Sequence, residues 1–172
     1  MAQAFSISYG ELAAMMNAAL RDVFTMMLHS SIKLEPWTEP PTVAAGVEKL
    51  FGNDTPLIVS NIGFSGDIFG FVYLFMGNET ADFIASRMLK PVNGGHHPLD
   101  IVNDAVGEFT NISIGGFKNQ LSQFGFPCSL TLPSILRGKS LSVEPVSGCV
   151  RKTFLFKVRG KPILSLLIIK ED

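Results

Sequence analysis

The chain has 172 residues, of which 47% are hydrophobic and 17% are charged, and its formal net charge is −1. This length suits one domain that spans residues 1–172, and the apolar composition excludes an intrinsically disordered chain. Because the net charge is close to zero, the sequence gives no reason to expect binding to nucleic acid or to an anionic membrane surface.

The first predicted element is a helix over residues 8–29. Ser8 and Glu11 have the spacing of a capping box, in which each side chain accepts a hydrogen bond from the backbone of the other residue. Apolar residues recur through this segment at helical spacing, and we interpret its methionines as core residues rather than as a partner-binding face. The residues in this pattern are Leu12, Met15, Met16, Leu20, Val23, Met26 and Met27.

The N-terminal segment lacks the basic start of a signal peptide, and Glu11 follows early. The longest apolar segment, residues 57–76, is interrupted by polar residues and glycines. A membrane span needs about 18 apolar residues in a row, so we expect no membrane insertion. Two cysteines, Cys128 and Cys149, are too few for a disulfide framework and favour reduced thiols. Together these features predict a cytoplasmic protein.

Residues 42–54 are predicted to form a first strand, and residues 56–77 a β-hairpin that turns near residues 65–67. The glycines of this hairpin do not match a phosphate-binding loop, because the GxxxxGK[ST] pattern is absent and no helix follows directly. Asn78 is predicted to cap a short helix over residues 78–89.

A loop over residues 91–100 contains His96 and His97, whose side chains diverge and are interpreted as solvated rather than as metal ligands. A long helix is predicted from Pro98 to Phe124, because proline suits a first helical position. Four β-type segments follow it, at residues 126–133, 140–146, 149–158 and 162–170. The last of these does not alternate, so we expect it to be covered on both faces.

The long helix carries Asp104, Glu108 and Asn111 at spacings of four and three residues. On a helix of 3.6 residues per turn, these side chains lie within about 60° of one another. A solvated helix face is the ordinary explanation, but two like charges at this spacing cost a few tenths of a kcal/mol. Three helix glycines also cost up to about 1 kcal/mol each relative to alanine, namely Gly107, Gly115 and Gly116. These costs favour the close approach of another chain or element.

These residues resemble the signature of the CheC/CheX/FliY family of chemotaxis phosphatases. That signature is Asp or Ser, Glu four residues on, Asn three further on and Pro about 22 beyond, which here are Asp104, Glu108, Asn111 and Pro133. The flanking segments "GFSGDIFGFVYLFMGNETADFIASRML" and "LPSILRGKSLSV" are similar to the CheX branch, which a single signature also favours. The resemblance implies an α+β fold of CheC/CheX type, with a long antiparallel-rich sheet packed against two long helices.

The resemblance also implies an enzyme that hydrolyses the aspartyl phosphate of a CheY-like response regulator. Asn111 would then position the attacking water, since a carboxamide both accepts and donates hydrogen bonds. Glu108 would pair with a lysine of the regulator, while Asp104 and Pro133 would support the site. The alternative is a non-catalytic, regulator-binding module of flagellar-switch or signalling-adaptor type, because one fold serves several functions.

The sequence contains no His, Cys and Asp cluster with the spacing of metal ligands, so we expect no cofactor of its own. The Mg²⁺ that the reaction needs would belong to the phosphorylated regulator. We also expect a homodimer, because CheX relatives are typically dimers and residues 162–170 look too apolar for an exposed edge strand. Strands within residues 127–170 would contribute to the contact and leave both Glu108–Asn111 pairs open to solvent.

Overall fold

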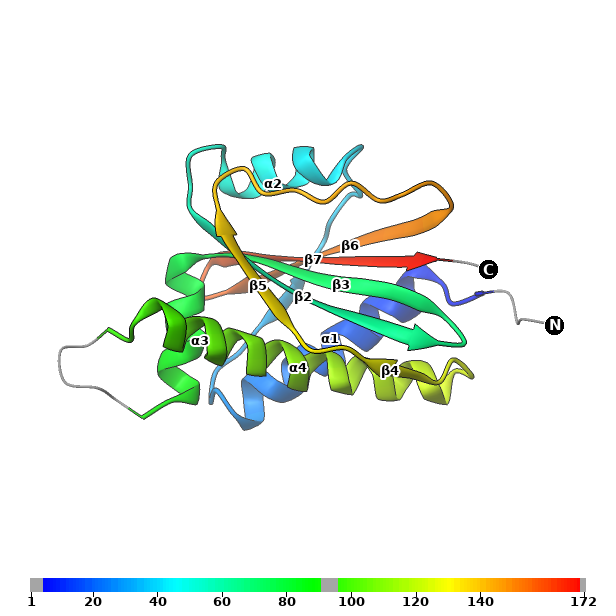
Figure 1. Cartoon of the computed structure of the whole chain (residues 1–172), viewed down its shortest axis with the longest axis horizontal. Coiled ribbons are helices and arrows are strands. Elements are labelled where there is room, and N and C mark those ends of the chain that lie inside the picture. The colour runs from blue at the N-terminus through cyan, green and yellow to red at the C-terminus, as the bar shows by residue number, and fades with distance from the viewer. Residues whose placement is uncertain (1–4, 91–95, 171–172) are drawn as a thin grey trace.

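The computed structural model describes residues 5–90 and 96–170, which form a seven-stranded antiparallel sheet with helices on both faces (Figure 1). The strands are β1 (Lys33–Glu35), β2 (Leu57–Gly66), β3 (Phe69–Gly77), β4 (Cys128–Leu130), β5 (Ser134–Gly138), β6 (Cys149–Val158) and β7 (Lys161–Lys170). The helices are α1 (Tyr9–Met26), α2 (Val43–Phe51), α3 (Asn78–Met88) and α4 (Leu99–Gln123). The strand order is β1-β6-β7-β3-β2-β4, and β5 pairs with β2 beside β4.

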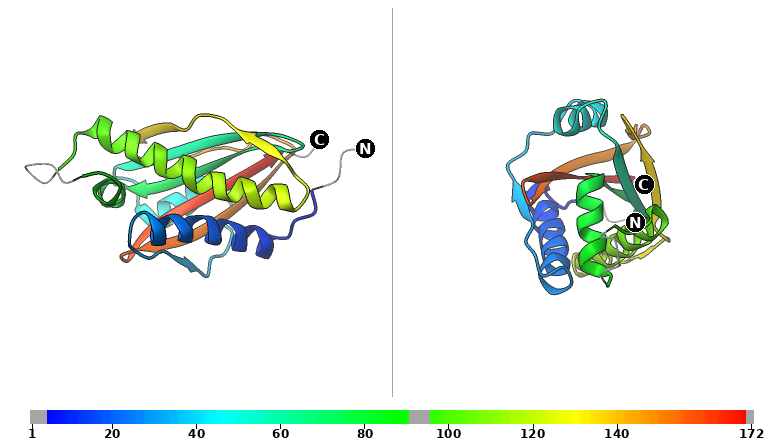
Figure 2. Two further views of the ribbon diagram at one scale, coloured as in Figure 1. Left: turned by 90° about the horizontal axis from the view of Figure 1, so that it is seen from below. Right: turned by 90° about the vertical axis from the view of Figure 1, so that its left-hand side faces the viewer.

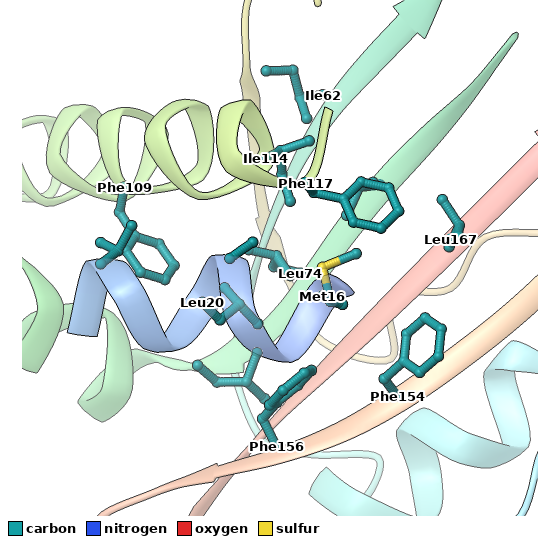
Figure 3. Close-up of a cluster of buried hydrophobic side chains, with 14 of the residues drawn as sticks. Met16, Leu20, Ile62, Leu74, Phe109, Ile114, Phe117, Phe154, Phe156 and Leu167 are labelled. Atoms are coloured by element: carbon teal, nitrogen blue, oxygen red, sulfur yellow. The ribbon is translucent and has the colours of Figure 1, made fainter. Parts of the chain in front are cut away.

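The helices divide between the two faces of the sheet, as the two views of Figure 2 show. Helices α1, α3 and α4 cover one face, and α2 lies against the other. The larger core forms under α1 and α4, where Phe109 and Phe117 of α4 meet Met16 and Leu20 of α1 above the strands (Figure 3). All four side chains are fully buried. The expected α+β fold, with an antiparallel sheet and two long helices, is therefore confirmed.

Strand β7 lies in the middle of the sheet, between β6 and β3. Residues 163–169 are buried on both faces, as their uninterrupted apolar character predicted. The inference that this segment is too apolar for a bare edge strand was right, but its use as an argument for a dimer was wrong. Its apolar residues are already covered within one chain. The homodimer itself stays a prediction.

Helix α1 begins as the sequence predicted. The Ser8 hydroxyl accepts a hydrogen bond from the Glu11 backbone N–H at 3.2 Å, and the Glu11 carboxylate accepts one from the Ser8 backbone N–H at 2.8 Å. Met15 and Met16 are core residues, but Met26, at the end of the helix, is 75% exposed. The interpretation of the methionines as core residues therefore holds only for the first half of the helix.

The prediction of a strand over residues 42–54 was wrong, because this segment contains α2. The Thr42 hydroxyl accepts a hydrogen bond from the Ala45 backbone N–H at 3.0 Å and caps the helix. Val43, Gly46 and Val47 are buried at spacings of three and four residues, which is the period of a helix against a sheet. The segment is too short to show a clear helical period, and its β-branched valines favour a strand.

The prediction of a strand over residues 140–146 was also wrong, because the strand in this region is β5. Residues 141 and 143 do pack onto the smaller core, while residues 142 and 144 are exposed. The alternation of apolar and polar residues therefore correctly indicated that one side of this segment faces the core. The edge of β2 that a strand here would need is taken by β5 and β4. Alternation without a free edge gives an extended loop rather than a strand.

The other predicted elements are found close to their expected positions. The hairpin is β2–β3, and the long helix is α4, which begins and ends within one residue of the expected Pro98 and Phe124. In the loop before α4, residues 91–95 lie outside the described residues, His96 is exposed and His97 is half-buried. Among the helices that the structure describes, none is both long enough and apolar enough to span a membrane.

Candidate active site on helix α4

The three polar side chains of α4 share one exposed side of the helix. Asp104, Glu108 and Asn111 are all exposed, whereas Ala105 and Phe109, which follow two of them directly, are buried against the core. This is the arrangement that the spacing of four and three residues predicted. We call these three side chains the polar stripe.

The polar stripe is not engaged by the chain itself. Within residues 5–90 and 96–170, neither Asp104 nor Glu108 forms an ion pair, since the three salt bridges there involve other acidic residues. In the same ranges, no hydrogen bond holds the Glu108 carboxylate or the Asn111 amide. Exposed groups of this kind are available to a partner, and their position on the outer surface of a helix suits a protein rather than a small molecule, which binds in a concave pocket.

Buried hydrogen bonds connect the helix turn that carries Asn111 to strand β2 of the sheet. The Thr110 hydroxyl is fully buried and lies 2.7 Å from both the Val106 carbonyl oxygen and the Ser60 hydroxyl of β2. It can donate to the carbonyl and accept from the serine, so all three groups are satisfied. The Thr110 and Ser60 hydroxyls are both buried and would lose a hydrogen-bond partner if the helix moved away from β2. Their hydrogen bond therefore fixes the helix turn that carries Asn111.

Pro133 lies directly against α4. A Cβ atom added at Gly107 would be 3.7 Å from Cγ of Pro133, which is ordinary van der Waals contact. The backbone of Gly107 therefore faces Pro133 across a gap that a Cβ atom would fill without a clash. Pro133 therefore lies beside α4, and its supporting role stays a prediction.

An arginine joins α4 to α3 and β5 near Asp104. Arg137 of β5 donates from Nε to Oδ1 of Asn103 at 2.7 Å and from Nη1 to Oδ1 of Asn78 at 3.1 Å. The expected role of Asn78 as a helix cap was wrong, because the cap position is Gly77 and the Asn78 side chain accepts from this guanidinium instead. We call these two hydrogen bonds the Arg137 brace. They hold Asn103, the residue before Asp104, close to helix α3.

The chemical groups of the polar stripe are two carboxylates and one amide, which supply charge and hydrogen bonds. Cys128 is buried, and this burial raises the pKa of its thiol, so it is not an activated thiolate. The carboxamide of Asn111 offers an acceptor and two donors one turn from the Glu108 carboxylate. Such a pair can orient a water molecule and a phosphoryl group, which is what phosphoryl transfer requires of a protein.

Metal binding by this chain alone is the subject of our first prediction. In the part of the chain that the structure describes, no group of three or more His, Cys, Asp or Glu side chains lies close enough to hold a metal ion. We expect elemental analysis of the purified, dialysed protein to find less than stoichiometric Mg²⁺ and Zn²⁺. One bound metal ion per chain after dialysis would contradict this expectation.

Sequence reasoning missed the residues that hold the polar stripe in place. Thr110, Ser60 and Arg137 come from one helix and two strands, and their contacts depend on the sheet order. A threonine on the apolar side of a helix is a weak signal of a buried hydrogen bond. For Arg137, nothing in the sequence indicates the brace, since it lies in a segment whose strand was not predicted.

A family model described as "Chemotaxis phosphatase CheX" matches residues 58–157, which is more than half of the chain and includes the whole polar stripe and Pro133. No curated protein sequence matches the chain.

Several solved structures share this fold over nearly their whole length. The chain is similar to a chemotaxis protein CheX from Vibrio vulnificus, with 20% identity, a TM-score of 0.73 and coverage of 96% of this chain and 100% of that one. A CheX protein from Desulfovibrio desulfuricans gives 17% identity, a TM-score of 0.74 and coverage of 93% and 99%. A CheX–CheY–BeF3–Mg complex from Borrelia burgdorferi gives 20% identity, a TM-score of 0.66 and coverage of 96% and 100%.

Proposed function

The chain belongs to the CheX family of chemotaxis phosphatases, and from this premise we propose that it hydrolyses the aspartyl phosphate of a CheY-like response regulator in the cytoplasm. The observation that carries the proposal is the exposed Glu108–Asn111 pair, held by buried contacts on a helix that the family model covers. A structural relative of the fold was solved in complex with CheY, BeF3 and Mg²⁺, which supports a partner of this kind.

Asn111 is proposed to position the attacking water. Its amide oxygen accepts a hydrogen bond from the water, and its amide N–H donates to a phosphoryl oxygen, so the water is aligned with the P–O bond to be broken. The water oxygen bonds to phosphorus, and the bond to the aspartyl oxygen breaks. The products are inorganic phosphate and the free aspartate carboxylate, so this chain forms no covalent intermediate.

Glu108 is proposed to set the docking register. Its free carboxylate, one turn before Asn111, can form a charge-assisted hydrogen bond with a lysine of the regulator. The Mg²⁺ that neutralises the phosphoryl charge is part of the phosphorylated substrate, so this chain supplies none. Asp104, one turn further back, is assigned a supporting role at the edge of the docked partner.

The test of this function is phosphate release from a phosphorylated CheY-like regulator, measured with and without the protein. Faster release at substoichiometric protein is the expected result, because an enzyme turns over. If the protein binds the beryllofluoride-activated regulator but leaves phosphate release at its intrinsic rate, the chain is a non-catalytic binding module and the proposed function is wrong.

We also propose that the chain is a homodimer, now without the edge-strand argument. Apolar side chains on the α2 face remain exposed, including Phe69 at 46%, Phe71 at 46% and Val146 at 71%. They line a groove with Tyr73 and Ile168 on the side of the sheet opposite α4. A contact there, with Val146 and Ile168 from the expected range 127–170, would leave both polar stripes open to solvent.

Light scattering at micromolar concentration measures this assembly. We expect a mass of about twice the 18.7 kDa of one chain. A mass of one chain would rule out the dimer, and a dimer that dissociates on Asn111 substitution would place the contact on the wrong face.

A further inference from the structure

We infer that the docked regulator covers more of this chain than the polar stripe: Leu132 anchors it on one side of α4, and Gly115 leaves room for it to approach the helix backbone. This inference rests on the proposed function for the identity of the partner. It is drawn from two features that the fold of the chain alone does not explain.

The first feature is a leucine held out in solvent. Leu132 is 90% exposed, more than any other large apolar side chain that the structure describes. The loop that carries it is fixed, because the Thr131 backbone N–H donates to the Gly63 carbonyl at 2.8 Å and the Thr131 hydroxyl accepts from the Gly63 N–H at 2.9 Å. On its other side, Pro133 rests on Gly107. Because the loop is already fixed, a partner that buries this side chain does not have to order the backbone that carries it.

The loop lies beside the polar stripe. Gly107 faces Pro133. Its neighbours on the helix surface, three residues before and four residues after, are Asp104 and Asn111. A partner seated on these two side chains therefore meets the loop at the edge of its contact area. The Leu132 side chain projects from that edge into solvent, where a shallow apolar pocket on the partner would cover it.

The second feature is a helix glycine without an intramolecular role. A Cβ added at Gly107 or Gly116 would make ordinary van der Waals contacts, at 3.7 Å from Cγ of Pro133 and at 3.5 Å from Cβ of Ala19. A Cβ at Gly115, in contrast, would meet no atom within 4 Å. Glycine costs helix stability relative to alanine, so a position with free space for a side chain is expected to carry one.

Gly115 continues the line of the polar stripe. It follows Asn111 by four residues and Glu108 by seven, which places all three on one side of α4. The helix surface one turn after Asn111 is therefore bare backbone. A partner loop can approach the helix there more closely than over any side chain, and this brings its phosphoryl group down to the amide.

The test of the anchor is the steady-state kinetics of Leu132→Asp with a phosphorylated CheY-like regulator. We expect KM to rise by about tenfold, because a carboxylate in an apolar pocket costs more than a lost contact, and kcat to fall by less than KM rises. Leu132→Met, which stays apolar, should restore KM. The matched control is Leu136→Asp, a leucine that is 54% exposed and pairs with Val59 of the smaller core, on the other face of the sheet.

The test of Gly115 combines two measurements on Gly115→Ala. Thermal unfolding should move to a higher midpoint, because alanine favours the helix and meets no atom. Binding to the beryllofluoride-activated regulator, measured by calorimetry, should weaken by about tenfold, because the methyl group blocks the approach. Gly10→Ala in α1, where an added Cβ also meets no atom, is the control and should leave binding unchanged.

A higher unfolding midpoint together with weaker binding of the regulator by Gly115→Ala supports the inference. Unchanged binding by Gly115→Ala, or an unchanged KM with Leu132→Asp, overturns that part of the contact surface. The calorimetric readout does not need catalysis, so it stands even if wild-type protein releases no phosphate. Failure of the proposed function and failure of this inference are therefore distinguishable.

Discussion

Asn111→Ala is expected to lower phosphate release from the phosphorylated regulator by on the order of 10²-fold or more, because the positioning of the attacking water is lost. Binding of the regulator should change little, since the exposed amide orients a water rather than holding the partner. The melting temperature should also change little, because substitutions of exposed side chains seldom alter stability by more than about 0.5 kcal/mol. A stopped-flow or phosphate-sensor assay at saturating regulator measures the rate.

Asn119→Ala provides the matched control for this variant. It removes the same amide from the same helix, at an exposed position two turns further along. Wild-type turnover is expected for this control. If Asn111→Ala also turned over at the wild-type rate, Asn111 would not position the water and the assignment of the site would be wrong.

Glu108→Lys is expected to weaken binding of the activated regulator by about tenfold or more, because a favourable contact with a lysine becomes a repulsion between like charges. The wild-type contact should weaken with rising salt, as interactions between exposed charges do, and the variant should lose that dependence or reverse it. Binding to immobilised, beryllofluoride-activated regulator at several salt concentrations measures both effects.

A matched charge reversal separates this local effect from net charge. Glu144→Lys makes the same change in formal charge at an exposed position by the groove on the α2 face. It should bind the regulator as the wild type does. Equal loss with both variants would mean that overall charge, and not a contact of Glu108, controls docking.

Helices α1, α3 and α4 and the hairpin of this protein were predictable because their signals are local. A capping box at Ser8 and Glu11, and the proline at the start of α4, report the backbone within one turn. The polar stripe was predictable for the same reason, since helical spacing alone places its three side chains on one side.

The errors arose where a segment's role depends on distant parts of the chain. Residues 140–146 alternate as a strand does, but they are not one because β5 occupies the edge they would need. The position of β7 within the sheet, and the brace by Arg137, depend on strand order. Short apolar segments such as α2 are ambiguous between helix and strand for a different reason, since they span too few residues to establish a period.

The central place of β7 has a consequence for how the chain reaches its active form. Strands β1 and β6 lie on one side of β7, and β3, β2, β4 and β5 lie on the other, so without β7 the sheet is two separate halves. This strand follows all the others along the chain, so the halves join only after every earlier segment is available. Pairings between distant segments form slowly, and until then the apolar edges of β3 and β6 are open to other molecules. A nascent chain that lacks residues 161–170 therefore has no completed sheet, although helix α4 packs on β2, β4 and β5, which all belong to one half.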